Sequence, residues 1–169
     1  MSLIFGGAGS GKSEFAEAFV CTLPGERIYL ATMLAEDGES LARIRRHRLQ
    51  RAHRAFKTVE RGFGLTAEAF PEGANVLLED LPNLLANEMF HPAGGGAEAV
   101  LPELEGLLRR SGHLTVVSGD VFGGGSEYEG ESLRYLQALA RVNRTLAAKA
   151  DLVVELVCGL PNVLKGELP

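Results

Sequence analysis

Short apolar runs alternate along the chain with longer segments in which apolar residues recur every three or four positions. The apolar runs are typical of buried strands, and they lie at 2–5, 27–32, 74–79, 113–118 and 151–157. The segments with helical spacing lie at 12–21, 39–54, 82–90, 100–110 and 132–149. A short strand is also expected at 56–60 and a short helix at 65–70. Strands that are apolar throughout and separated by helices indicate an α/β fold with a mostly parallel central sheet and helices on both faces.

The length and composition fit one such domain spanning residues 1–169. Hydrophobic residues make up 46% of the chain and charged residues 23%, which excludes disordered and fibrous classes of protein. With 17 basic and 22 acidic residues the net charge is −5, so we expect no nucleic-acid partner. No apolar run is long enough to span a membrane, and the first residues lack the pattern of a signal peptide. We therefore expect a cytoplasmic protein with no membrane span.

A glycine-rich segment directly after the first apolar run carries the strongest chemical signal in the sequence. It reads GGAGSGKS, which matches the phosphate-binding pattern GxxxxGK[ST] between a strand and a helix. Glycines allow the backbone to curl around an anion with its N–H groups turned inward, and the following helix adds the positive end of its dipole. We therefore expect a P-loop NTPase-like domain that binds a nucleotide. The expected binding residues are Gly6, Gly7, Ala8, Gly9, Ser10, Gly11, Lys12 and Ser13.

Two of these side chains and one strand end predict how the phosphates and a magnesium ion are held. Lys12 is expected to reach the β- and γ-phosphates as a catalytic group, and the Ser13 hydroxyl to ligate Mg²⁺. A P-loop protein also needs an acidic residue at the end of another strand to hold or orient the metal. The apolar run 74–79 ends in Glu79, which is followed by Asp80. Glu79 is the first choice for this role and Asp80 is the second.

The segment 39–54 concentrates positive charge in an otherwise acidic chain. Six of the 17 basic residues lie there, namely Arg43, Arg45, Arg46, Arg48, Arg51 and Arg54. The cluster fits a solvated helix face, contact with RNA or DNA, or capture of nucleotide phosphates; nucleic acid is disfavoured because no aromatic side chains are interleaved. Arg43, His47 and Arg51 are spaced four residues apart and share one helical face. Since nearby arginines disfavour a charged imidazole, His47 is expected to stay neutral and is a candidate nucleophile.

Further motifs follow in a fixed order along the chain. They are YLAT at 29–32, RIRRHRLQR at 43–51, FKTVE at 56–60, RVN at 141–143 and GLPNVLK at 159–165. Together with GGAGSGKS they resemble the bifunctional adenosylcobinamide kinase / adenosylcobinamide-phosphate guanylyltransferase family of cobalamin biosynthesis. Members of that family carry GGxRSGKS, YIAT, RIxxHRxxR, WxTxE and GLPxxLK in the same order. The resemblance extends from Leu3 to Lys165, which is nearly the whole chain.

This resemblance implies an activity and a set of functional residues. Enzymes of the family phosphorylate the aminopropanol hydroxyl of adenosylcobinamide with ATP or GTP, and then transfer GMP from GTP to that phosphate through a guanylylated histidine. By position His47 matches that histidine, which implies a catalytic role. Nucleotide contacts are implied for Thr32, Met33, Arg48, Arg51, Glu60 and Glu79. The family also implies Mg²⁺, a corrinoid substrate and a homo-oligomer, namely a trimer.

The chain departs from the family pattern at three places. Gly9 stands where the family has arginine, and Phe56 stands where it has tryptophan. The loop 119–130 begins with Gly119 and Asp120 where the family has Asn-Glu, and it lacks the family's proline. This loop is expected to face the corrinoid or the catalytic centre. Two alternatives therefore stay open: a diverged paralogue with only one half-reaction or another acceptor, and a non-catalytic nucleotide-binding switch.

Overall fold

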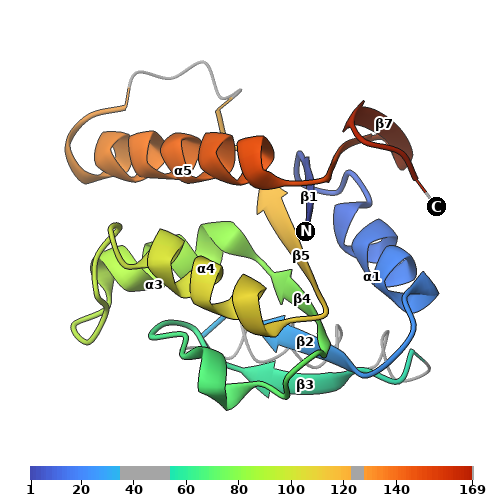
Figure 1. The fold of residues 1–169 in the computed structure, drawn as a ribbon. Helices are drawn as coiled ribbons and strands as arrows, with labels where there is room; N and C mark the ends of the chain where they lie inside the picture. Colours follow the sequence, from blue (N-terminus) through green and yellow to red (C-terminus); the bar gives the residue numbers. More distant parts are fainter. Residues whose placement is uncertain (35–53, 123–127, 169) are drawn as a thin grey trace.

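The computed structural model describes residues 1–34, 54–122 and 128–168, and these residues form a sheet covered by helices (Figure 1). Within them the strands follow the order β3-β2-β4-β5-β1-β6-β7 across the sheet. The strands are β1 (Ser2–Gly6), β2 (Arg27–Ala31), β3 (Lys57–Glu60), β4 (Asn75–Glu79), β5 (His113–Gly119), β6 (Leu152–Val157) and β7 (Leu160–Lys165). All neighbouring strands pair in parallel except β6 and β7, which are antiparallel. The predicted α/β fold with a mostly parallel sheet is thus confirmed.

The helices connect the parallel strands and lie where the sequence predicts them. In the described ranges they are α1 (Lys12–Thr22), η1 (Ala67–Ala69, a 3-10 helix), α3 (Leu81–Phe90), α4 (Val100–Arg110) and α5 (Gly130–Lys149). None of the helices in these ranges is long and apolar enough to cross a membrane. The helix expected at 39–54 lies almost entirely outside the described residues.

Alternating side chains of the strands build a hydrophobic core on each face of the sheet. Ile4 and Leu77 are fully buried in a cluster with α1 on one face. Leu3 and Leu78 are buried on the other face, which α3, α4 and α5 cover (Figure 1). Burying one such side chain contributes about 2 kcal/mol. Because apolar side chains and helices cover both faces, we expect a ligand to bind at the edge where the carboxyl ends of the parallel strands meet.

The sequence pattern does not predict β7. All six of its residues are exposed, so it has no apolar run to mark it as a strand, and it contains Pro161. Proline is tolerated in this position because β7 is the last strand at one edge of the sheet. A tight turn joins β6 to β7 through Cys158 and Gly159, which have φ angles of 51° and 82°.

A buried carboxylate on α3 fixes two neighbouring loops. Glu88 is 1% exposed and accepts hydrogen bonds from the backbone N–H groups of Gly64 (2.6 Å) and Gly95 (2.5 Å). Glu103 on α4 interacts with it directly. Burial, together with the negative charge of Glu88, raises the pKa of Glu103 to about 7. Near neutral pH the folded protein therefore favours the state in which one carboxyl group of this pair is protonated.

This pair predicts how the stability of the protein depends on pH. The folded-state pKa of Glu103 lies above its ordinary value of 4.5, so the folded protein binds this proton more tightly than the unfolded chain does. The resulting stabilisation is complete below the ordinary pKa and is lost as the pH rises through the folded-state value. We expect the melting temperature of the wild type to fall relative to that of Glu103→Gln between about pH 5 and about pH 8. Thermal denaturation followed by circular dichroism measures this, and parallel curves for the two proteins would contradict the assignment.

Candidate functional site

The phosphate-binding loop joins the end of β1 to the start of α1. Three of its glycines are required by close backbone contact or by a positive φ angle. A Cβ atom on Gly6 would lie 2.6 Å from the carbonyl oxygen of Leu156 and equally close to Ser10 Oγ, so only glycine fits there. Gly9 and Gly11 have φ angles of 70° and 89°, in the left-handed region that favours glycine. The loop thus delivers the chain to the first turn of α1, where unpaired backbone N–H groups are available to an anion.

A hydrogen bond from Ser13 to Glu79 connects the loop to the middle of the sheet. Ser13 Oγ donates to Glu79 Oε1 at 2.6 Å, although Glu79 ends β4 and β5 lies between β4 and β1. Burial raises the pKa of Glu79 to about 8, while the Ser13 hydrogen bond and the Lys12 charge act in the opposite direction. The other carboxylate oxygen, Oε2, is buried without a hydrogen-bond partner in the described part of the chain. One hydroxyl and one such carboxylate fit Mg²⁺, which prefers oxygen donors and would favour the ionised carboxylate.

Asp80, the second choice for the metal-facing acid, has a different role. Its Oδ1 accepts a hydrogen bond from the backbone N–H of Asn83 at 2.9 Å, which caps the N-terminus of α3. A cap of this kind stabilises a helix by about 1 kcal/mol. The geometry therefore favours Glu79 over Asp80 as the acid that faces the loop.

Lys12 lies at the first position of α1 and folds back over the loop. Its Nζ donates a hydrogen bond to the carbonyl oxygen of Gly7 at 3.2 Å. Its charge is among the influences that lower the pKa of Glu79, so the ammonium and the carboxylate belong to one electrostatic site. The structure thus brings together the loop 6–11, Lys12, Ser13 and Glu79.

Three other predicted nucleotide contacts lie at or just after the ends of β2 and β3. Thr32 is fully buried, and its hydroxyl donates to the carbonyl oxygen and accepts from the N–H of Asp80, both at 2.8 Å. Its side chain therefore positions the backbone that follows Glu79. Met33 comes next and is half-buried, whereas Glu60 is exposed at the end of β3 with β2, β4 and β5 between β3 and β1. The structure does not place Glu60 beside the loop, and nucleotide contacts for Thr32, Met33 and Glu60 stay predictions.

The predicted nucleophile lies outside the described residues. His47, Arg48 and Arg51 fall within 35–53, together with most of the arginine cluster, so their roles stay predictions. The chain is described again from Arg54, whose guanidinium donates to Glu17 Oε2 on α1 at 3.0 Å. The end of this segment is therefore attached to the helix that begins with Lys12.

Sequence reasoning missed the support that the turn between β6 and β7 gives to the loop. The backbone N–H of Gly159 donates to the carbonyl oxygen of Ser10 at 2.9 Å. Its Cα would lie 3.4 Å from a Cβ atom on Gly11, so the turn and the loop are in contact. Gly159 opens the motif at 159–165, so a signal was present in the sequence. The motif alone does not reveal which part of the fold it contacts.

Comparison with known proteins gives matches over almost the full length. Residues 2–164 match the family described as cobinamide kinase / cobinamide phosphate guanyltransferase. The chain is 36% identical over 174 residues to the bifunctional adenosylcobalamin biosynthesis protein CobP of Pseudomonas aeruginosa, covering 98% of this chain and 97% of that protein. It is 33% and 32% identical to the bifunctional adenosylcobalamin biosynthesis proteins CobU of Salmonella typhimurium and Escherichia coli, covering 98% of this chain and 99% of each relative.

The different contacts of the two adjacent acids predict different effects of neutralising them. Glu79→Gln removes the charge beside Ser13, so we expect the Mg²⁺ concentration needed for half-maximal nucleotide binding to rise about tenfold or more. Asp80→Asn is the matched control, because asparagine caps a helix as well as aspartate does. Titration calorimetry with Mg²⁺ and a nucleoside triphosphate measures both variants. An unchanged titration for Glu79→Gln, with an impaired Asp80→Asn, would move the role to Asp80.

Proposed function

The chain belongs to the cobinamide kinase / cobinamide phosphate guanyltransferase family, and we propose that it catalyses both reactions named in that description. In the first reaction, the aminopropanol hydroxyl of adenosylcobinamide receives the γ-phosphate of ATP or GTP. In the second, GMP from GTP is joined to the new phosphate. The names of its relatives, bifunctional adenosylcobalamin biosynthesis proteins, support a place in cobalamin biosynthesis.

The observation that carries the proposal is the hydrogen bond between Ser13 and Glu79 beside a complete phosphate-binding loop. Phosphoryl transfer depends on positioning and on stabilising charge rather than on covalent chemistry by the protein. The loop amides and Lys12 supply donors and positive charge to the β- and γ-phosphates. These groups are held before the nucleotide arrives, so little reorganisation is needed during the reaction.

Ser13 and Glu79 are the residues that would hold Mg²⁺. When bound, the ion neutralises charge on the β- and γ-phosphates. Glu79 is suited to this task because it is buried next to Ser13 and its Oε2 has no hydrogen-bond partner within the described ranges. Lys12, the residue before Ser13 on α1, contributes its own positive charge, which acts to lower the pKa of Glu79.

For the second reaction we assign the nucleophile to His47. The imidazole nitrogen attacks the α-phosphorus of GTP, the bond from that phosphorus to the bridging oxygen breaks, and pyrophosphate leaves. The phosphate of cobinamide phosphate then attacks the phosphorus of the GMP-histidine and frees the imidazole. The resemblance of RIRRHRLQR to the family's motif supports this role, with Arg48 and Arg51 offsetting phosphate charge.

The proposal also includes a cytoplasmic homotrimer, as the family resemblance implies. The described surface has apolar side chains that a second copy of the chain could cover, because Leu160 and Leu164 of β7 are 72% and 55% exposed. Light scattering coupled to size-exclusion chromatography measures the mass of the assembly.

Replacing Lys12 tests the phosphate-binding assignment. We expect Lys12→Ala to lower the rate of phosphoryl transfer by about 100-fold or more, because a charge aimed at the β- and γ-phosphates is lost. Lys57→Ala is the control, since Lys57 is an exposed lysine on β3 that pairs with Glu26. The measurement is the steady-state release of nucleoside diphosphate in the presence of adenosylcobinamide. Wild-type turnover in Lys12→Ala would refute the assignment.

A labelling experiment tests the assignment of His47. Protein incubated with Mg²⁺ and GTP labelled at the α-phosphate should retain label after denaturation, because a phosphoramidate to histidine is covalent. The label should be acid-labile, absent with γ-labelled GTP, absent in His47→Ala and present in His53→Ala. Unlabelled protein that still binds GTP would exclude the guanylyl transfer step. A kinase alone, or a nucleotide-binding switch, would then explain the binding.

A further inference from the structure

The strand β5 lies between the two strands that build the phosphate site, and its end carries an acid with no role so far. Gly119 at the end of β5 pairs in register with Gly6, the first residue of the phosphate-binding loop. The next residue is Asp120, whose backbone N–H donates to the carbonyl oxygen of Gly6 at 3.0 Å. On its other side β5 pairs with β4, which ends at Glu79. Asp120 therefore lies at the edge of the sheet between the loop and the metal-facing acid.

Among the described acids at this edge, Asp120 is the one placed to meet a second substrate. Glu79 is bonded to Ser13, and Asp80 caps α3. Glu60 is four strand positions from β1, which at about 4.8 Å between strands puts it about 19 Å away. Asp120 is one strand position from β1 and exposed, and its Oδ1 accepts a hydrogen bond from the backbone N–H of Phe122 at 3.2 Å. Within the described ranges this is the one hydrogen bond to the Asp120 carboxylate, so its second oxygen is available to a ligand.

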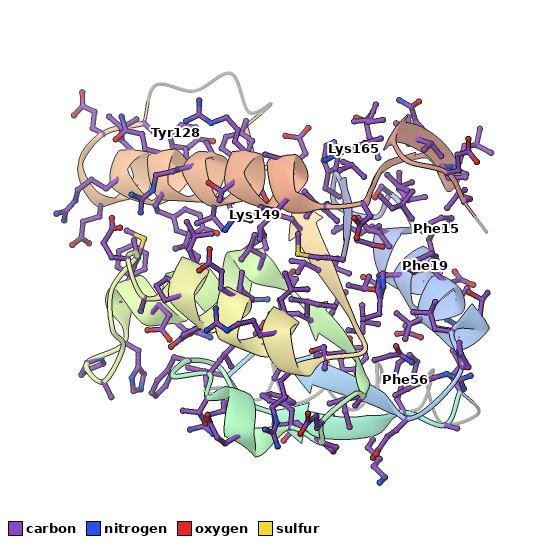
Figure 2. All side chains as sticks on the ribbon, in the orientation of Figure 1. Phe15, Phe19, Phe56, Tyr128, Lys149 and Lys165 are labelled. Carbon is purple, nitrogen blue, oxygen red and sulfur yellow. The ribbon has the colours of Figure 1, made fainter. Side chains whose placement is uncertain are left out.

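A hollow with aromatic walls begins at Val121, the residue that follows Asp120 in the chain. Its volume is about 440 Å³, and it is formed by Phe90, Val121, Tyr128 and Tyr135 with Glu131 and Ser132. Tyr128 lies two residues before the start of α5 (Figure 2), and it is 39% exposed, while Phe90 is 47% exposed. Tyr135 is fixed by a hydrogen bond from its hydroxyl to the carbonyl oxygen of Pro82 at 3.1 Å. The hollow therefore combines exposed aromatic rings with a firmly held wall. Asp120 lies between this hollow, which begins at the next residue, and a second groove that Asp120 itself lines.

We propose that this hollow receives the corrinoid acceptor and that Asp120 contacts the hydroxyl that is phosphorylated. The inference rests on the proposed kinase function, which requires a second substrate with a large flat ring and a single reacting hydroxyl. Aromatic side chains match the face of such a ring, and the polar residues Glu131 and Ser132 match the amide groups at its margin. The hollow holds one side of the ring and leaves the rest in solvent.

The chemical step assigned to Asp120 is proton transfer. Its carboxylate accepts the proton of the acceptor hydroxyl while the hydroxyl oxygen bonds to the γ-phosphorus. The bond between that phosphorus and the β–γ bridging oxygen breaks, and the nucleoside diphosphate leaves with the electron pair. The proton then passes from Asp120 to water. A positioned base of this kind contributes about 10²- to 10⁴-fold to a rate.

The test of the acid uses Asp120→Asn, with Glu129→Gln as a matched loss of charge in the same loop. We expect kcat for phosphorylation of cobinamide to fall by about 100-fold or more in Asp120→Asn and to stay unchanged in Glu129→Gln. Binding of ATP, labelling by α-labelled GTP and the melting temperature should equal those of the wild type in both variants. Wild-type kcat in Asp120→Asn would overturn the role of the acid. Wild-type protein that binds ATP but never phosphorylates cobinamide would instead overturn the proposed function itself.

The test of the hollow separates binding of the ring from chemistry. Phe90→Ala and Tyr128→Ala should raise KM for cobinamide about tenfold while kcat and KM for ATP stay unchanged, because only contacts to the ring are lost. Leu164→Ala is the comparison variant, since Leu164 lines a separate apolar groove of about 300 Å³ that Asp120 also lines. A raised KM for cobinamide in Leu164→Ala, with wild-type values in Phe90→Ala and Tyr128→Ala, would place the ring in that groove and overturn the proposal.

Discussion

The hydrogen bond from Ser13 to Glu79 is the contact on which the rest of the site depends. It joins the first turn of α1 to the end of β4, across the strand that separates β4 from β1. Burying a carboxyl group is costly unless a donor or a positive charge compensates it. Ser13 supplies the donor and Lys12 supplies the positive charge. The two residues are neighbours in the first turn of α1, directly after the loop. One local turn thus brings together the groups that a bound triphosphate requires.

Contacts distant in the sequence hold this arrangement in place. Thr32 fixes the backbone of Asp80 from the end of β2, and Gly159 supports Ser10 from the turn after β6. The parallel sheet then places the end of β5 between the loop and Glu79, which is where we propose that a second substrate approaches. The proposed nucleotide site and the proposed corrinoid site therefore lie at the same edge of the sheet.

The sequence was sufficient for the features that depend on local pattern. Apolar runs identify the buried strands, and GGAGSGKS identifies the loop, while the position of Glu79 at the end of a run ranks it above Asp80. β7 could not be predicted because its residues are exposed and carry no pattern. The buried hydroxyl of Thr32 could not be interpreted either, because its partner Asp80 lies 48 residues away. The sequence pattern reveals elements and local motifs, but it does not reveal contacts between residues that are far apart in the chain.

We propose that one phosphate-binding loop, next to the hydrogen bond between Ser13 and Glu79, holds the triphosphate of the nucleotide substrate. A crystal structure with Mg²⁺ and a non-hydrolysable GTP analogue would test this arrangement. We expect the β- and γ-phosphates within hydrogen-bond distance of the amides of 6–13, Lys12 Nζ beside them, and the metal ion next to Ser13 Oγ on the side of Glu79. Phosphates bound elsewhere on the protein, with the Ser13–Glu79 hydrogen bond unchanged and no metal ion beside it, would show that the loop does not hold the nucleotide.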